Sequence, residues 1–464
     1  MKKSIMMLVM ALVMCVTFAD VAKAATEYGV TILGEKVTSD NMSGNGWRYE
    51  PAASDGEMAK LYLTNANMVA DASKTDVGVI CSNDPLEVVL VGTNTIRMTG
   101  MPTKSDYVGI GAGDLKISGS GSLNIISSLD ESAQVSTSAL ISGYELLIDD
   151  GVTINIQDGN AEKEYACDGK FGIFAPYITI GSNVKLNIEI SGKYSCDNHF
   201  GLACIYNMAG VIVGDNCNIV LDGSKVTNAV ENGYVNGFSG LQLSVGENTT
   251  VDIDMGNSNT NGIHCGYLNI GKDSVIKAYG GTKGIWCYPE EDQEVVHPAI
   301  GGSKIGDAYD LTTAIDPEDE DFMVFMHGNN IAKYVEIGPL LTINLKCDNG
   351  TVNKTSFTMH NGHAVGTLPT PVSSRKDYVF TGWYTAKTGG TKVYSTTKLT
   401  KSMTLYAQWK KITYNITLNA NGGSVGTSKI VVEYDGKLGT LPTPTRTGYT
   451  FTGWYTAKTG GTKV

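Results

Sequence analysis

Three stretches of the sequence share one pattern, and this pattern decides the fold: GIFAPYITIG from Gly172 to Gly181, GFSGLQLSVG from Gly237 to Gly246, and GIHCGYLNIG from Gly262 to Gly271. Each begins and ends with Gly, and most of its apolar residues alternate along the chain, which is the side-chain period of a β-strand. Related starts occur at Gly78, Gly109, Ala139, Gly201 and Gly284. The interval between starts varies, so insertions separate the units.

Each unit holds two or three short strands, which are too few to bury an apolar face alone. Stacking such units buries a continuous core, and this favours a parallel β-helix. The alternative, a sandwich of hairpins, would need tight two-residue turns that the sequence does not show. We therefore predict an all-β chain with a right-handed parallel β-helix over residues 25–338 and stacked rungs from 78 to 290. The residues expected inside are Ile110, Ile173, Ile188, Leu202, Phe238, Ile253, Ile263 and Ile285.

The first 24 residues predict export. Lys2 and Lys3 precede an apolar stretch that ends at Phe18, and Ala22-Lys23-Ala24 supplies a cleavage site of small residues. This is the order of a secretory signal peptide, and its apolar stretch is short for a membrane span. The alternative is an uncleaved anchor. We predict a signal peptide over 1–24, a secreted protein of the cell envelope, and no transmembrane segment after cleavage.

Charge divides the remaining chain into two modules. Residues 25–340 hold 17 Lys and Arg against 42 Asp and Glu, a net charge of −25, whereas residues 341–464 hold 15 against 4, a net charge of +11. Such an asymmetry predicts two modules with different surroundings, with a boundary near Gly338-Pro339. The basic module is expected to attract anionic polymers.

The basic module contains an internal repeat. The run from Phe380 to Val393 recurs identically from Phe451 to Val464, and the first unit closes with MTLYAQW from Met403 to Trp409. These motifs closely resemble the Listeria–Bacteroides repeat, the B-repeat of internalin-type surface proteins. The resemblance implies two small β-grasp-like domains, at 341–410 and, incomplete, at 412–464, which act as stalks or weak adhesion modules. Trp383, Trp409 and Trp454 are expected to be core residues.

The acidic module also carries a resemblance. Segments such as GWRYE from Gly46, LYLTNAN from Leu61 and GDLKISGSGSL from Gly113 are similar to the carbohydrate-binding β-helix modules of clostridial surface proteins. The similarity covers roughly residues 40 to 310. It implies glycan binding, and some relatives bind acidic plant polysaccharide such as pectate with Ca²⁺.

Outward positions supply a first candidate site. Phe174, His264 and Trp286 each lie two residues after a unit start, with Ala203 and Ser239 between them in the column. Aromatic rings aligned on a rigid sheet suit stacking against the apolar faces of sugar rings. We predict a glycan-binding column at Phe174, His264 and Trp286; the alternative is that loops cover this face.

A second candidate site is acidic. Glu189, Asp222 and Asp254 fall at one offset in successive units, and Asp252 points to the same side as Asp254. Stacked carboxylates repel one another unless a cation bridges them, so Ca²⁺ is the expected cofactor. The alternative is a solvated acidic face. The neighbouring column of Asn124, Asn155 and Asn187 predicts a structural ladder of side-chain amides.

A column of small buried residues is expected three positions after the unit starts. It comprises Cys81, Ala112, Ala175, Cys204, Gly240, Cys265 and Cys287. Two interpretations stay open: a ladder of free thiols, or a disulfide between Cys265 and Cys287, because neighbouring rungs lie about 4.8 Å apart.

The sequence shows no catalytic motif. It lacks the serine-hydrolase elbow, the zinc-protease helix and the phosphate loop, and no Arg occurs between Arg97 and Arg375 to serve a pectin-degrading lyase. Asp149 and Asp150 are adjacent on a predicted strand, so they point to opposite faces. We predict a non-enzymatic surface protein that binds a polysaccharide or cell-wall glycan, with no nucleic acid partner. The alternative is a purely structural or protein-binding adhesin whose partner is a host surface component.

Overall fold

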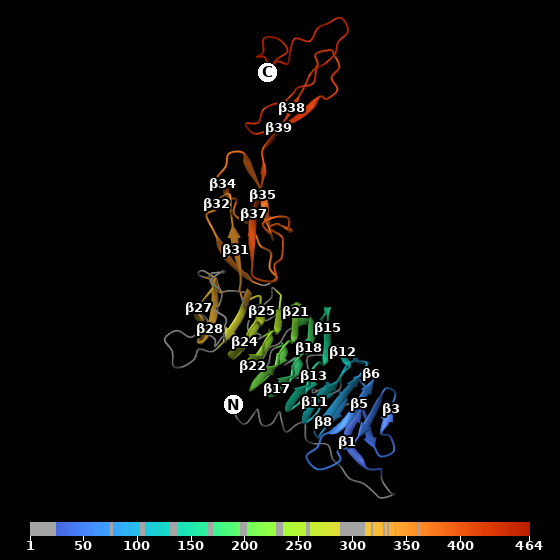
Figure 1. The fold of residues 1–464 in the computed structure, drawn as a ribbon. Helices are drawn as coiled ribbons and strands as arrows, with labels where there is room; N and C mark the ends of the chain where they lie inside the picture. Colours follow the sequence, from blue (N-terminus) through green and yellow to red (C-terminus); the bar gives the residue numbers. More distant parts are fainter. Residues whose placement is uncertain are drawn as a thin grey trace. The chain divides into compact units, whose positions relative to one another are not determined.

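A computed structural model describes residues 25–464 except 75–77, 103–106, 130–137, 166–169, 195–201, 229–234, 257–259, 288–310, 317–318, 328–329, 332–333, 339 and 361. The predicted signal peptide lies outside the described residues. The chain divides into two compact units, Met1–Pro339 and Leu340–Val464. All regular structure in the described part is β-strand (Figure 1).

The first unit is a parallel β-helix, as predicted from the repeated units. A typical rung has three strands, β7 (Gly78–Ser82), β8 (Leu86–Val91) and β9 (Thr93–Gly100). The corresponding strands of the next rung, β10 (Val108–Gly111), β11 (Asp114–Gly119) and β12 (Ser122–Leu129), pair with them in parallel. Figure 1 shows the rungs following one another from the blue to the yellow-green part of the chain.

Two sheets run along the β-helix. The first sheet takes two strands from most rungs and continues through β5 (Ala59–Thr64), β13 (Ser138–Ser142), β14 (Glu145–Ile148), β16 (Lys170–Phe174), β17 (Tyr177–Ile180), β19 (Leu202–Tyr206), β20 (Gly210–Val213), β22 (Val235–Val245), β24 (Asn261–Ile270) and β26 (Lys283–Cys287). The second sheet takes one strand from each rung and continues through β6 (Asn67–Asp71), β15 (Thr153–Tyr165), β18 (Lys185–Tyr194), β21 (Asn218–Asn228), β23 (Thr250–Asp254) and β25 (Val275–Tyr279).

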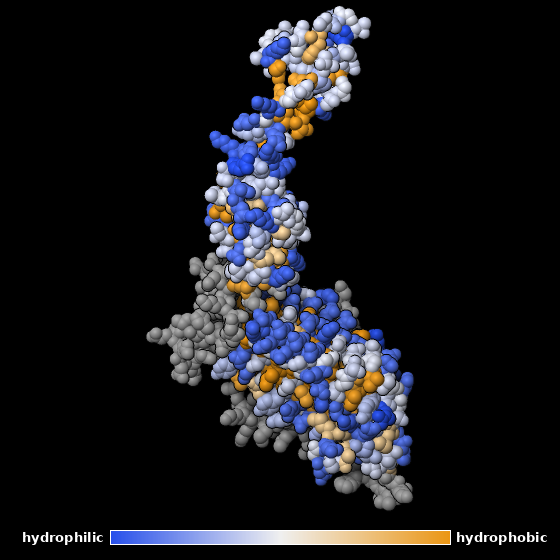
Figure 2. Space-filling view, in the orientation of Figure 1, coloured by the Kyte–Doolittle hydropathy of each residue, from blue (hydrophilic) through white to orange (hydrophobic). Residues whose placement is uncertain are grey.

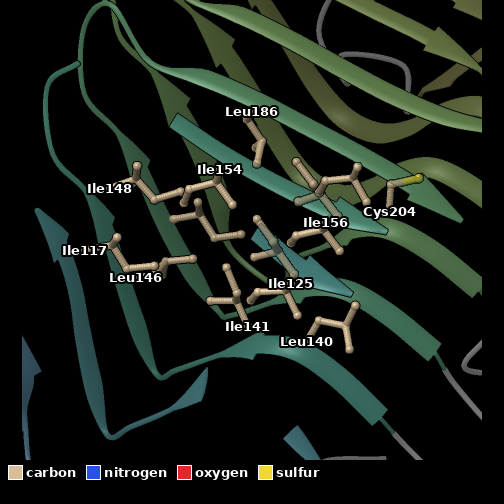
Figure 3. Packing of buried hydrophobic residues seen from close by; sticks show 14 of the residues in the cluster. Ile117, Ile125, Leu140, Ile141, Leu146, Ile148, Ile154, Ile156, Leu186 and Cys204 are labelled. Carbon is tan, nitrogen blue, oxygen red and sulfur yellow. The ribbon is translucent and has the colours of Figure 1, made fainter. Parts of the chain in front are cut away.

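The core fills the space between these sheets. Figure 3 shows Ile117, Ile125 and Ile141 pointing toward one another from different strands. The predicted interior residues whose side chains are described are all buried, namely Ile110, Ile173, Ile188, Phe238, Ile253, Ile263 and Ile285. The side chain of Leu202 lies outside the described residues. Burying an Ile or Leu stabilises the fold by about 1.5–3 kcal/mol, so each rung adds to one continuous core.

The Gly-plus-apolar start of a unit has a steric cause. Gly172 and the following Ile173 are both buried, whereas side chains of a regular strand alternate between faces, so the strand bends at this position, which we call the corner. A Cβ on Gly172 would lie 2.7 Å from Cγ2 of Ile188, inside the core. A Cβ on Gly237 would lie 2.2 Å from Cγ2 of Ile253. Gly at these corners therefore lets the two sheets approach closely.

A recurring turn joins the first sheet to the second. Asn183, Asn216, Asn248 and Asp273 each have a φ between 51° and 60°, and each lies two residues after a Gly that directly follows a strand. Asn and Asp tolerate this left-handed conformation better than other residues with a side chain. The turn explains why the units end in Gly followed by a polar pair.

Antiparallel strands cover both ends of the β-helix. At the start, β1 (Glu27–Ile32) pairs with β7 and with β2 (Glu35–Thr38), while β3 (Ser43–Gly44) and β4 (Trp47–Glu50) extend from β5. At the other end, β30 (Tyr334–Ile337) pairs with β25, and β28 (Asp319–His327) pairs with β26, β27 (Leu311–Asp316) and β29 (Asn330–Ile331). Covered edges protect a sheet against pairing with other chains.

The second unit contains the two repeats. In the first repeat a mixed sheet has the order β33 (Ser356–His360), β31 (Leu340–Lys346), β37 (Met403–Lys411), β35 (Tyr378–Tyr384) and β36 (Lys392–Val393). A two-stranded sheet of β32 (Gly350–Thr351) and β34 (Val372–Ser373) accompanies it. The parallel pair β31–β37 forms the centre of a β-grasp-like sheet, although no helix packs on it in the described part.

The repeated tryptophans Trp383 and Trp454 make the same hydrogen bond in the two repeats. Trp383 is buried, as predicted, and its Nε1 donates a hydrogen bond to the carbonyl oxygen of Pro369 at 2.8 Å. In the second repeat, which contains β38 (Thr413–Thr417) and β39 (Lys429–Glu433), Nε1 of Trp454 donates the same bond to Pro442 at 2.8 Å. Trp454 and Trp409 are only half-buried.

Candidate functional site

The predicted aromatic column exists, with one change of register. Phe174 pairs with Tyr206, which is followed by Ser239, His264 and Trp286 on successive strands. The sequence prediction placed Ala203 in this column, and this was wrong. The prediction counted from Gly201 as the start of the unit. In the structure Cys204 lies in register with Gly172 at the corner, so Tyr206 pairs with Phe174.

The rings of this column stack on one another and are at least half-buried. Trp286 is only 5% exposed, while Phe174 and His264 are half-buried. His264 stacks on Trp286 with ring centroids 4.3 Å apart, and Phe174 stacks on Tyr206 at 5.7 Å. The expectation of an exposed platform at Trp286 was therefore wrong, because its ring faces His264 in the column. Glycan binding at Phe174, His264 and Trp286 stays a prediction.

The acidic column also exists in the predicted register. Glu189 pairs with Asp222, which pairs with Asp254. Asp252 lies in the neighbouring column, between Val220 and Lys277.

The carboxylates of this column have other partners. Oε1 of Glu189 lies 2.5 Å from Nζ of Lys225, and this hydrogen bond raises the pKa of Lys225. Oδ1 of Asp222 accepts a hydrogen bond from the backbone N–H of Ser224, and Oδ1 of Asp254 accepts one from Gly256, each at 2.9 Å.

These carboxylates are therefore not gathered into one group, and Ca²⁺ binding at Glu189, Asp222, Asp252 and Asp254 stays a prediction. Within the part of the chain that the structure describes, no three His, Cys, Asp or Glu side chains come together in a group able to hold a metal ion. Alignment along a column brought the residues into register, but Asp222 and Asp254 bind backbone N–H groups two residues further on and Glu189 binds Lys225.

The asparagine column forms the predicted amide ladder. Nδ2 of Asn187 donates to Oδ1 of Asn155 at 2.7 Å, and Nδ2 of Asn155 donates to Oδ1 of Asn124 at 2.8 Å. Nδ2 of Asn124 donates in turn to the carbonyl oxygen of Asn94 at 3.2 Å. The ladder connects successive rungs on the outer face of the second sheet.

The cysteine column is only partly as predicted. Cys265 and Cys287 are register partners on the neighbouring strands β24 and β26, in the column of Gly240. Cys204 instead lies in the corner column of Gly172, and Cys81 lies in register with Gly111, in the outward column of Phe174. The side chain of Cys287 lies outside the described residues, so the disulfide between Cys265 and Cys287 stays a prediction.

Sequence reasoning missed a set of exposed aromatic residues on the first sheet. Tyr144, Tyr177 and Tyr267 are each about half exposed, at 54%, 50% and 49%. Ile212 and Leu241 are exposed near them on β20 and β22. In Figure 2 hydrophobic residues lie interspersed among hydrophilic ones on the visible face of the β-helix. The sequence did contain a pattern that could have identified two of them, because Tyr177 and Tyr267 both lie five residues after the Gly that starts their unit.

Earlier rungs of the same sheet carry charges. Nζ of Lys116 lies 3.4 Å from Oε1 of Glu87 and 3.1 Å from Oδ2 of Asp149, and Lys60 lies 3.2 Å from Glu87. The hydrogen bond to Asp149 raises the pKa of Lys116. Asp150 turns away and accepts a hydrogen bond from the backbone N–H of Ser182 at 2.7 Å. Asp149 and Asp150 thus serve separate interactions and do not form a paired-carboxylate site.

A buried ion pair lies inside the β-helix. Nζ of Lys170 lies 3.2 Å from Oδ2 of Asp158, and the two side chains are 1% and 0% exposed. Neither was singled out from the sequence, because a Lys at the start of a strand gives no sign that it points inward.

The described residues contain no helix that is long and apolar enough to cross a bilayer.

Comparisons with known proteins give a family match in the second unit and several relatives of the chain. Residues 342–408 and 414–464 match the Listeria-Bacteroides repeat domain. Internalin H of Listeria monocytogenes is 48% identical over 92 residues, which cover 19% of this chain and 16% of that protein. A "putative Gly-rich membrane protein" of Evansella cellulosilytica is 37% identical over 82 residues, 17% of this chain and 9% of that protein. The chain thus spans less than a fifth of the length of these relatives, and the family domain that it matches lies in the second unit.

Proposed function

We propose that this protein is a non-catalytic, cell-surface glycan-binding protein. The β-helix binds a glycan, and the Listeria-Bacteroides repeats display it at the cell envelope. The observation that carries the proposal is the outer surface of the first sheet, where half-exposed tyrosines stand on strands fixed by a continuous core. Aromatic rings on a rigid sheet present apolar faces that match the C–H faces of sugars.

The repeats support the surface location. They match the Listeria-Bacteroides repeat domain, and the chain is similar to Internalin H and to a protein described as a membrane protein. Export by the predicted signal peptide is consistent with such a location. Asp149 and Asp150, the adjacent carboxylates considered for catalysis, have separate partners in Lys116 and the backbone of Ser182.

A glycan array probed with the full chain tests the proposal. The array is run once with Ca²⁺ and once with a chelator, because the resemblance to pectate-binding modules implies Ca²⁺ and the carboxylate geometry does not. We expect binding to a defined class of glycans in both conditions. A chain that binds no glycan in either condition would contradict the proposed function.

The alternative function is a protein-binding adhesin. The basic repeats favour it, since a net charge of +11 attracts anionic partners such as a host surface component. Binding of the full chain to host cells that persists after enzymatic removal of their glycans would support this alternative.

A further inference from the structure

We infer that the outer face of β17, β20, β22 and β24 is the binding site for a neutral glycan chain, and that binding there needs no Ca²⁺. This inference rests on the proposed glycan-binding function and adds the site and the class of ligand. We call these two outward columns of side chains the tyrosine face. They comprise Tyr177, Gly210, Gln242 and Tyr267 in one column and Thr179, Ile212, Ser244 and Asn269 in the other.

The two tyrosines define the length of the face. Tyr177 lies in register with Gly210, and Gln242 lies in register with Tyr267. Three steps between neighbouring strands separate the rings, a distance of about 14 Å. Between the two rings the surface is not raised at Gly210, because this residue has no side chain. A short oligosaccharide laid across the strands would stack a sugar on each ring and pass over Gly210.

The strands hold the rings in place. Ile178 and Ile180 flank the outward positions of β17, and Leu268 and Ile270 flank those of β24; all four side chains are buried. Tyr144, one rung earlier, packs edge-to-face on Tyr177 with ring centroids 6.1 Å apart. Binding therefore needs little ordering of the protein, which reduces the entropic cost of association.

Polar groups between the rings match sugar hydroxyls. Nε2 of Gln242 donates to Oγ of Ser244 at 2.8 Å, and Nδ2 of Asn269 donates to the same oxygen at 3.2 Å. This small network orients two side-chain amides on the outer face. Amides and hydroxyls both donate and accept hydrogen bonds, as sugar hydroxyls do.

The charge distribution selects a neutral ligand. None of the eight positions of the tyrosine face carries Asp, Glu, Lys, Arg or His. Elsewhere the outer surface is charged, with Lys60, Glu87 and Lys116 on the first sheet. The surrounding module has a net charge of −25, so its field repels anionic polymers such as uronic acid chains. With no cation on the face to offset that field, a neutral glycan is the favoured occupant.

Calorimetric titration of the full chain with a neutral oligosaccharide from the array tests the site. The variants are Tyr177→Ala, Tyr267→Ala and Gly210→Glu. The last introduces a charge without removing a ring, and a Cβ at Gly210 would meet only Cβ of Gln242 at 3.7 Å, an ordinary contact. The matched control is Tyr394→Ala, which removes a tyrosine that is 59% exposed in the first repeat. Thermal unfolding of each variant verifies that it is folded.

We expect each tyrosine variant and Gly210→Glu to weaken binding about tenfold or more, about 1.4 kcal/mol in binding free energy, with the control unchanged. Chelator should not alter the affinity. If the chain binds glycans but these variants bind as tightly as the wild type, or if it binds only uronic acid chains, the inference fails and the proposed function stands. If the wild type binds no glycan at all, the proposed function fails with it.

Discussion

The side-chain amide of Asn187 donates a hydrogen bond to that of Asn155 on the neighbouring rung, and Asn155 continues the ladder to Asn124. Identical side chains on successive strands bond in this way because parallel register places them one above the other. Hydrogen bonds on the outer face therefore stabilise the stacking of the rungs, in addition to the apolar core.

Substitution of Asn155 tests the ladder. Asn155→Ala removes two hydrogen bonds between half-buried amides, so we expect the free energy of unfolding to fall by about 1–2 kcal/mol. Denaturant unfolding measures it. Gln157→Ala, an exposed outward residue of the same strand, is the control and should change stability by less than about 0.5 kcal/mol. Equal effects of the two substitutions would show that the ladder adds nothing.

The buried pair of Lys170 and Asp158 gives a second prediction. Asp158→Ala removes the carboxylate 3.2 Å from a fully buried ammonium group, and we expect a loss of about 3–5 kcal/mol. Glu189→Ala, which breaks the exposed ion pair with Lys225, should cost no more than about 1 kcal/mol. Comparable losses in the two variants, measured by denaturant unfolding, would contradict the assigned burial.

Two thiols give a prediction about pH, that of the buried Cys204 and that of the half-buried Cys81. Burial raises the pKa of Cys81 to about 12 and raises the pKa of Cys204 as well, from a usual value of 9.0. The unfolded chain thus releases these protons at lower pH than the folded chain, so stability should be unaffected below about pH 8 and fall as pH rises above 9. Urea unfolding from pH 7 to 10.5 measures this loss.

A Cys81→Ala, Cys204→Ala double variant is the matched control for the thiols. It should lose less stability over the same pH range than the wild type does. In the native wild type at pH 8, neither thiol should react with Ellman's reagent, because only the thiolate reacts. Rapid reaction of both, or an identical pH profile in the double variant, would disprove the assignment.

Much of the fold follows from the sequence because rung formation is local and repetitive. The alternation around Ile173 and Ile263 identified the core, and a constant offset brought Glu189, Asp222 and Asp254 into one column. Identical runs around Trp383 and Trp454 identified the repeats.

The errors arise where the sequence pattern carries no information about the environment of a side chain. Gly201 resembles a unit start, but Cys204 occupies the corner, so Tyr206 replaced Ala203 in the aromatic column. Trp286 lies at an outward position, and periodicity alone cannot tell whether such a position is covered. The hydrogen bonds from backbone N–H groups to the carboxylates of Asp222 and Asp254 depend on local backbone geometry that an offset does not contain.

The basic repeats provide a prediction about salt. With a net charge of +11, they should retain the full chain on an immobilised anionic polymer such as heparin at low ionic strength. Retention should weaken as salt rises above about 0.15 M, where the screening length is about 8 Å. A chain held equally well at low and at high salt would show that the attraction is not electrostatic.

Affinity electrophoresis of the full chain tests the central claim most directly. Native gels are cast with a neutral polysaccharide, with a uronic acid polysaccharide, or with neither, and all contain a chelator. We predict that the neutral polysaccharide retards the wild type and that a Tyr177→Ala, Tyr267→Ala double variant migrates as it does in the empty gel. Unchanged migration of the wild type in the neutral gel, or retardation by the uronic acid polysaccharide alone, would contradict the account.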